Sequence, residues 1–443
     1  MLYRLKVPGV IGIFILIVNS LNAQNKPDTV TAVPLSLSEI WAKADAYSKV
    51  IKIQALKVAA SEKEINDAKA AVLPELSVKG NLERASNLPM YENGLLEPPT
   101  QHNIIHTRYK IGSEAYFNLY NGNKTNLKIS AENTRHQLIS EQLHLSAADI
   151  HLRATTYYLD IQQHLQFRDL VVKNIAEQEK QLAQIRDFQK NGVVLNSDVL
   201  RAELKLSRQK MLLVQLENDI TIASQKLNIL IGEATNFRVL PGESTDTLPL
   251  EPAETYVNAA LQHSHQYKIS AQQTTLSKIK VQDIKGNLAP KAGLYAEYNY
   301  AYPQTMLYPY AAAPYGFGII GIKAAFPVSG FYHNKNKVAA ARIELSQQTL
   351  EQQHLEEDLR QQINEARIRY EEDLQRITVA RENVAQATEN YRIVTNTYAN
   401  QTALITDLLD ADVQLLQTKF ELSASLVAAR LQYYKLQYII GDL

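Results

Sequence analysis

The sequence predicts a mixed fold in which long antiparallel coiled-coil helices and four β-strands form an internal two-fold repeat. The first observation is a segment from about Lys124 to Lys190 without proline or glycine. It predicts one helix of about 67 residues, roughly 100 Å long at ~1.5 Å per residue. The second observation is a set of short segments with alternating polarity. The third is that the same order of segments returns in the second half of the chain.

Two apolar stripes explain how so long a helix is stabilised. Their members lie seven residues, or a multiple of seven, apart: Leu138, Leu145, Leu152 and Leu159 in one stripe, and Leu143, Ile150, Tyr157 and Val171 in the other. A seven-residue repeat keeps an apolar seam against a partner helix in a left-handed coil. Two seams therefore predict two neighbouring helices. Asn191-Gly192 supplies the left-handed residue that ends helices.

The N-terminus has the form of a secretory signal peptide. Arg4 and Lys6 precede an apolar run over 10–18, and a cleavage region follows, so we expect residues 1–23 to be removed after Ala23. A short membrane anchor is the alternative, but the run is shorter than the ~20 residues of a spanning helix. The zero formal net charge gives no indication of nucleic acid, and the absence of cysteine excludes disulfides and thiol chemistry.

The first repeat is expected over residues 24–232 and opens with a helix. Ser36 and Glu39 fit a capping box at its start. The helix should run without a break to about Val72, because the residue before Pro74 avoids the helical region.

Two strands follow this helix. Apolar and polar residues alternate over 76–83 and again over 109–119, which predicts strands with one apolar and one polar face. The long helix comes next. After Gly192 the chain turns back, and Ser197 is a favourable N-cap for a returning helix that ends at Gly232.

The second repeat is expected over residues 233–443 and has the same order. The expected elements are a helix over about 253–288, strands around 294–302 and 320–328, a long helix over about 333–398, and a last helix starting near Thr406. One constant shift maps Phe117 onto Phe326, Asp198 onto Asp407 and Gly232 onto Gly441. This agreement is strong support for an internal duplication.

The strands have the length and polarity pattern of membrane barrel strands. Four strands cannot close, and open sheet edges do not persist in lipid, so several chains must pool their strands. Two chains would give eight strands and an interior filled by side chains, whereas three would give twelve strands and an open lumen. On this arrangement, Leu76, Val78, Leu82, Ile320 and Ile322 face lipid, and Lys79, Glu83, Glu297 and Lys323 face water.

Several local features recur together in one known family. They are the duplication, the helix ends before Pro74 and Pro290, the strand-to-helix turns 119–122 and 326–330, and the hairpin tips 192–200 and 401–409. By their order and spacing, the chain resembles the TolC-like outer membrane efflux proteins of Gram-negative bacteria from about Leu35 to Leu443. Gln401-Thr402 departs from the family pattern, which has a glycine at the start of the second tip.

The resemblance implies a homotrimer. Its three chains would form a 12-stranded β-barrel in the outer membrane that continues into an α-helical barrel, a long periplasmic tunnel. It also implies docking of a periplasmic adaptor protein and an inner-membrane pump. The expected docking residues are those of the two tips: Gly192, Val193, Leu195, Ser197, Asp198, Thr402, Ala403, Leu404 and Thr406.

Asp407 and Asp410 are the acidic residues of greatest interest. They lie three apart at one helix start, so they can point the same way. The simpler explanation is that a helix start favours an aspartate through the helix dipole. The resemblance implies that aspartates at these positions line a closed periplasmic constriction.

No Ser-His-Asp set, phosphate-binding loop or paired-carboxylate cleft occurs in the sequence, so we expect neither an enzyme nor a cofactor. His102 and His106 lie four apart, but in a proline-rich loop, so we expect no metal site there. The predicted function is an exit duct for small molecules or protein in a tripartite efflux or type I secretion system. The alternative is a secreted or periplasmic coiled-coil structural protein without a pore.

Overall fold

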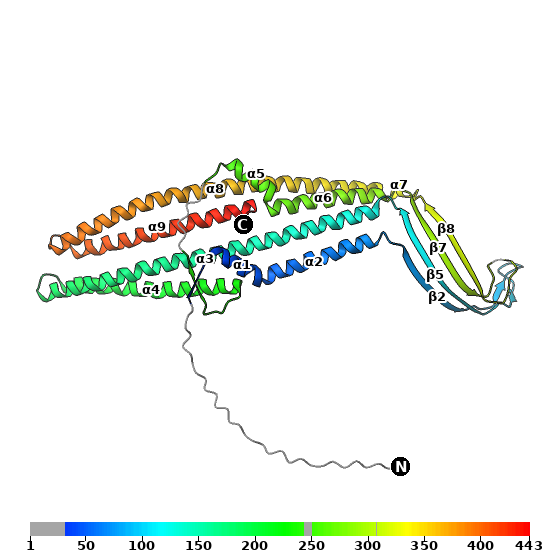
Figure 1. Cartoon of the computed structure of the whole chain (residues 1–443), viewed down its shortest axis with the longest axis horizontal. Coiled ribbons are helices and arrows are strands. Elements are labelled where there is room, and N and C mark those ends of the chain that lie inside the picture. Colours follow the sequence, from blue (N-terminus) through cyan, green and yellow to red (C-terminus); the bar gives the residue numbers. More distant parts are fainter. Residues whose placement is uncertain (1–31, 243–249, 307) are drawn as a thin grey trace, which may run out of the picture.

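The computed structural model describes residues 32–242, 250–306 and 308–443; the expected signal peptide lies outside them. The chain is elongated, with a bundle of long helices that continues into a curved sheet at one end (Figure 1). The helices are α1 (Leu37–Tyr47), α2 (Lys49–Ala70), α3 (Lys124–Lys190), α4 (Asn196–Ile231), α5 (Ala253–His263), α6 (His265–Gly286), α7 (Gly330–His333), α8 (Lys335–Ala399) and α9 (Ile405–Ile440). The strands are β1 (Ala32–Leu35), β2 (Glu75–Arg84), β3 (Leu88–Met90), β4 (Thr100–His102), β5 (Thr107–Tyr120), β6 (Arg238–Pro241), β7 (Lys291–Tyr302) and β8 (Tyr315–Ala325).

The two long helices confirm the prediction from the proline-free segments. Helix α3 has 67 residues and α8 has 65. Helices α2 and α4 follow one another along α3, and α6 and α9 do the same along α8 (Figure 1). The sides of α3 not taken by these partners contact α6 and α9. Helix α3 therefore has neighbouring helices on two sides, as its two apolar stripes predict.

The helix expected to run unbroken to Val72 is in fact divided at Ser48, so this prediction was wrong. The Ser36–Glu39 capping box is present at the start of α1. At Ser48 the backbone leaves the helical region (φ −54°, ψ 119°), and its hydroxyl accepts a hydrogen bond from the N–H of Ile51, which starts α2. Ser264 divides α5 from α6 with the same dihedral angles, φ −54° and ψ 120°. Neither break is marked by proline or glycine.

The four main strands form one antiparallel sheet in the order β2-β5-β7-β8. Paired residues in neighbouring strands share a face. Leu76 pairs with Ala115, Ala115 with Ala296, and Ala296 with Ile320, so the apolar positions of all four strands lie on one face, as predicted. The polar face carries ion pairs of Lys79 with Glu114 at 2.5 Å and of Lys110 with Glu297 at 3.1 Å.

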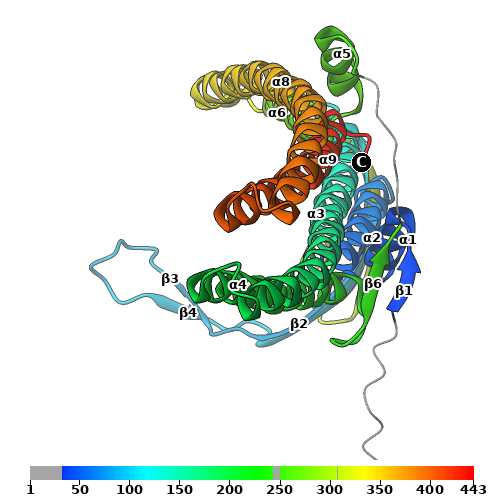
Figure 2. The same ribbon diagram turned by 90° about the vertical axis from the view of Figure 1, so that its left-hand side faces the viewer.

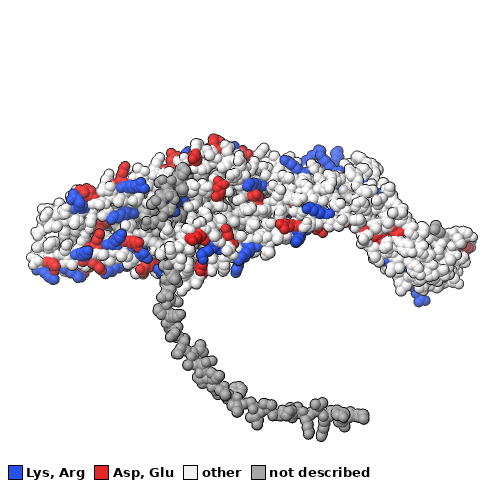
Figure 3. Space-filling view, in the orientation of Figure 1, with Lys and Arg blue, Asp and Glu red and all other residues white. Residues whose placement is uncertain are grey.

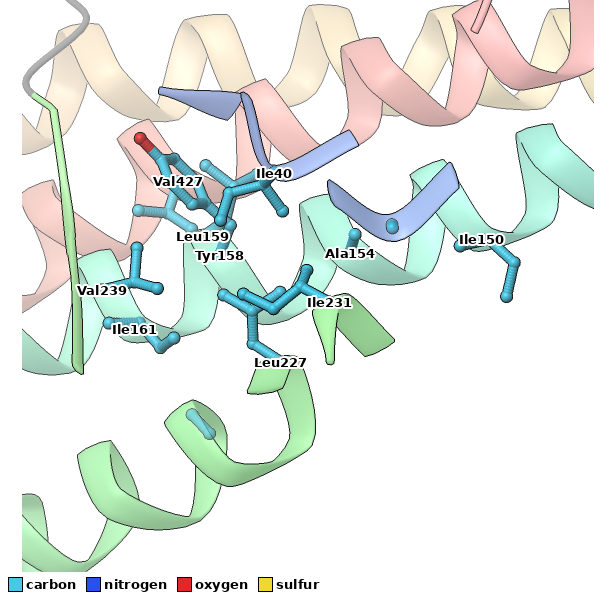
Figure 4. Packing of buried hydrophobic residues seen from close by; sticks show 12 residues of the cluster. Ile40, Ile150, Ala154, Tyr158, Leu159, Ile161, Leu227, Ile231, Val239 and Val427 are labelled. Carbon is cyan, nitrogen blue, oxygen red and sulfur yellow. The ribbon is translucent and has the colours of Figure 1, made fainter. Parts of the chain in front are cut away.

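The main hydrophobic core lies in the middle of the molecule, where α1, α3, α4 and β6 meet (Figure 4). Ile40, Leu159 and Leu227 are completely buried there. The Tyr158 hydroxyl donates to the carbonyl of Leu35 at 2.9 Å and accepts from the N–H of Gly242 at 3.0 Å. This core fixes β1 and β6, which pair in parallel, on the helix wall.

Seen along its length, the helix wall is an arc (Figure 2). Helices α1 and α5 and the strands β1 and β6 lie on its convex side. None of the helices in the described part of the chain is both long and apolar enough to cross a lipid bilayer.

Candidate functional site at the hairpin tips

The first hairpin tip joins α3 to α4 at the end of the molecule opposite the sheet (Figure 1). Gly192 adopts a φ of 73°, as predicted for the residue that ends the long helix. Val193 and Leu195 are exposed, Leu195 with 71% of its surface. The turn therefore presents apolar side chains at the extremity of the helix wall.

The second tip joins α8 to α9 by the same kind of turn. Gln401 has a φ of 60° and occupies the place that Gly192 has in the first tip. The Thr402 hydroxyl donates to the carbonyl of Thr397 at 2.9 Å, and Leu404 is exposed to 69%. Gln401 therefore keeps the turn, although a residue with a side chain is strained in this left-handed conformation.

The prediction that Ser197 caps α4 was wrong. Helix α4 begins at Asn196, and Ser197 lies in its first turn with an exposed side chain. Leu195 occupies the cap position, and its N–H donates to Oδ2 of Asp198 at 3.2 Å. A carboxylate three residues into the helix thus satisfies a backbone donor at the cap.

The two tips lie against each other and share an apolar cluster. It consists of Leu182, Ile185, Val199, Ala202 and Leu206 from the first hairpin and Ile405 and Leu408 from the second. A cleft of about 240 Å³ between the tips is lined by residues that include Val193, Leu195, Ala403 and Leu404. Tyr398 also lines it, and burial together with the negative charge of Asp198 raises the pKa of this phenol. Of the predicted docking residues, Thr402 is exposed, and Ala403 and Thr406 are half-buried.

Asp407 and Asp410 have different surroundings although they share a helix start. Oδ2 of Asp407 accepts a hydrogen bond from the N–H of Leu404 at 3.2 Å, which repeats the contact between Asp198 and Leu195. Asp407 therefore caps α9 through this hydrogen bond. Asp410 is exposed, and its charge acts on Lys205 of α4.

A buried ion pair behind the tips was not predicted. Lys205 Nζ on α4 lies 2.7 Å from Oδ2 of Asp412 on α9, and their side chains are only 11% and 3% exposed. Asp412 also accepts hydrogen bonds from Asn174 at 2.8 Å and Gln178 at 2.9 Å, both on α3. Lys205 donates in addition to the carbonyl of Leu409 at 2.6 Å. Burial lowers the pKa of Lys205, while the charge and hydrogen bond of Asp412 oppose this shift.

Comparison with known proteins agrees with this architecture. A family model described as outer membrane efflux protein matches residues 42–233. The outer membrane efflux protein BepC of Brucella suis is 22% identical over 327 residues, which are 72% of this chain and 66% of BepC. Residues 42–233 of the chain are thus similar to the outer membrane efflux protein family. The fold of the chain is that of the outer membrane protein VceC of Vibrio cholerae (TM-score 0.75, 15% identity, 91% of this chain and 96% of VceC). It also matches CusC (TM-score 0.78, 13% identity, 93% of each chain).

The sequence does contain a signal for the buried ion pair. Leu408 and Leu415 are members of the seven-residue apolar stripe of α9, and Asp412 lies between them, close to the same seam. A carboxylate near such a seam requires a buried partner. Lys205 precedes the stripe residue Leu206, and it is the buried partner of this carboxylate.

His102 and His106 lie at the far end of the sheet, on β4 and next to β5. The described residues include no group of three or more side chains able to hold a metal ion.

Proposed function

We propose that this chain is an outer-membrane exit duct that passes small molecules or protein from the periplasm to the outside. One observation carries the proposal. The apolar face of the four-stranded sheet is solvent-exposed in the chain, with Leu76 exposed to 79%, Val78 to 77% and Ile320 to 83%. A continuous apolar surface of this kind requires an apolar environment, and a lipid bilayer supplies one.

The edges of the sheet bear on how the chains assemble. Strands β2 and β8 are the edges of the sheet, and each has one neighbouring strand in the described chain. An open edge is unfavourable in lipid, so the edges pair between copies. We propose a homotrimer with a 12-stranded barrel that continues into an α-helical barrel, because twelve strands leave an open lumen. The arc of helices with its concave side free fits one third of such a tunnel (Figure 2).

The chain organisation and the tips complete the proposal. Residues 24–232 and 233–443 are two structural repeats that follow a signal peptide over residues 1–23. The tips, at the end away from the membrane, dock a periplasmic adaptor protein that connects the duct to an inner-membrane pump. Asp407 and Asp410 line the constriction at that end. The exposed Leu195 and Leu404 support docking, because exposed apolar side chains on paired turns are typical of a binding surface.

Fractionation and conductance test this function. The full-length protein should be found in the outer membrane as a trimer whose mobility changes on heating, and it should form conducting pores in planar bilayers. The coiled-coil structural protein without a pore predicts a soluble, elongated oligomer and no conductance. That result would refute the duct. The exposed apolar sheet face speaks against this alternative, because a soluble protein would bury it.

A further inference from the structure

The outward side of α8, next to the sheet, carries cations in a defined stripe. Helix α5 lies on the convex side of the arc and packs its Tyr256 and Val257 with Ile363 of α8 (Figure 2). Lys335 and Arg342 precede Ile363 by multiples of seven residues, so they lie on the same convex stripe of α8. Both side chains are exposed.

Helix α6 continues this surface. Lys280 forms an ion pair with Glu344 of α8 across one side of the seam between the two helices. Lys278 and Lys285 are exposed. At ~100° per residue, both lie about 140–160° around α6 from Lys280, on the other side of the seam. This is the side on which α8 carries Lys335 and Arg342. The view of the side bearing α1 and α5 shows Lys and Arg gathered over α6 and α8 towards the sheet (Figure 3).

In the described part of the chain, these four cations form no ion pair with an acidic side chain. Among the described residues, no ion pair involves Lys278, Lys285, Lys335 or Arg342, although neighbouring Lys124 pairs with Asp283 at 3.6 Å. The stripes themselves are free of carboxylates near the sheet: the residues beside the cations are Val338, Ala339, Leu345, Ser346 and Thr349 on α8, and Ala271, Thr275 and Gln282 on α6. An unpaired cationic surface of this kind is complementary to an anionic partner.

The position of the surface identifies that partner. Ile320 and Ile322 stand on the apolar sheet face, and Phe326 continues this face at the base of the sheet. The Phe326 ring meets Phe331 of α7 edge-on, with 5.9 Å between ring centroids, and Lys335 follows within about one turn. From the sheet towards the helices, apolar side chains are followed by aromatic and then by cationic side chains. A bilayer presents its hydrocarbon core, its interface and its phosphates in the same order along its normal.

We propose that Lys278, Lys285, Lys335 and Arg342 form a surface that binds the phosphates of anionic phospholipid headgroups in the leaflet on the helix side. This inference rests on the proposed function, because it requires the sheet to lie in the membrane. A trimer would carry the surface three times. Each cation close to an anionic membrane surface strengthens binding by about fivefold.

Native mass spectrometry of the purified trimer in mixed micelles of phosphatidylglycerol and phosphatidylcholine tests the proposal. The wild type should retain phosphatidylglycerol preferentially. The variant K278Q/K285Q/K335Q/R342Q should lose this preference by at least about tenfold. The matched control K173Q/K180Q/R201Q/R208Q removes the same charge from exposed positions near the tips and should keep the preference.

Two outcomes overturn the lipid surface. One is a quadruple variant that retains phosphatidylglycerol as the wild type does. The other is displacement of phosphatidylglycerol by an equal concentration of inorganic phosphate, which would indicate a site for free anions. Conductance separates the two proposals: a conducting outer-membrane trimer without lipid preference refutes only the lipid surface. A chain that neither fractionates with the outer membrane nor conducts refutes the duct itself.

Discussion

The sheet and the helices just behind the tips place apolar and charged side chains in opposite ways. In the sheet, Val78 and Ile320 are exposed on one face, and charged pairs such as Lys79–Glu114 lie on the other. At the tips, Ile405 and Leu408 are buried, and an ion pair, Lys205–Asp412, is enclosed behind them. The difference fits the proposed function, which places lipid around the sheet and water around the tips.

The largest effect is expected from the buried pair at the tip end. Asp412→Ala leaves the ammonium of Lys205 buried without its carboxylate and removes the acceptor for Asn174 and Gln178. Breaking a buried pair on one side costs about 3–5 kcal/mol. Thermal unfolding of the purified protein, with limited proteolysis at the tips, should show the loss.

A second variant separates the pair from the general packing of α9. The double change K205M/D412L replaces both charges by apolar side chains, which is often neutral in stability. It should recover most of what Asp412→Ala loses. Equal destabilisation by the double and the single variant would mean that the pair is not the source of the effect.

At the sheet end, the expected penalty is smaller and depends on the face. Arginine at Val78 places a charge on the apolar face and should cost about 2–4 kcal/mol in a bilayer. Arginine at Asn81, on the polar face of the same strand, should cost much less. Both positions lie in β2 and are exposed in the chain, so the pair is matched. Equal assembly defects for the two variants would contradict the assignment of the apolar face to lipid.

The turns allow a finer comparison between the two tips. Gly192→Val puts a β-branched residue at φ 73° and should cost about 1–3 kcal/mol of backbone strain. No neighbouring atom lies within 4 Å of the added Cβ, so the cost is conformational. Gln401→Gly should instead relieve strain at φ 60°. Both variants should still form trimers. Gly192→Val should impair export, which is measured as accumulation of cargo in the cell, whereas Gln401→Gly should leave export unchanged. Normal export with both variants would argue against docking at the tips.

Much of this architecture follows from local sequence. The long helices could be predicted because the absence of proline and glycine and the seven-residue stripes both act within the segment itself. The sheet faces could be predicted because side chains alternate strictly along a strand. The breaks at Ser48 and Ser264 could not, because α1 and α5 turn away from the wall to pack on the convex side, and serine alone does not mark a break. The Lys205–Asp412 pair joins α4 to α9 across α3. Only the folded arrangement brings these residues together.

The smallest expected effect on stability comes from Asp407 and Asp410. Asp407 caps α9 through the N–H of Leu404, so alanine would remove a capping contact together with the charge. The double variant D407N/D410N removes both charges and leaves side-chain oxygens in place to accept hydrogen bonds. In a trimer it would remove up to six carboxylates from one ring, and such rings favour cations. We expect an unchanged unfolding temperature, weaker cation selectivity and weaker block by multivalent cations in planar bilayers. Wild-type selectivity and block in D407N/D410N would limit these aspartates to the helix start and place the constriction elsewhere.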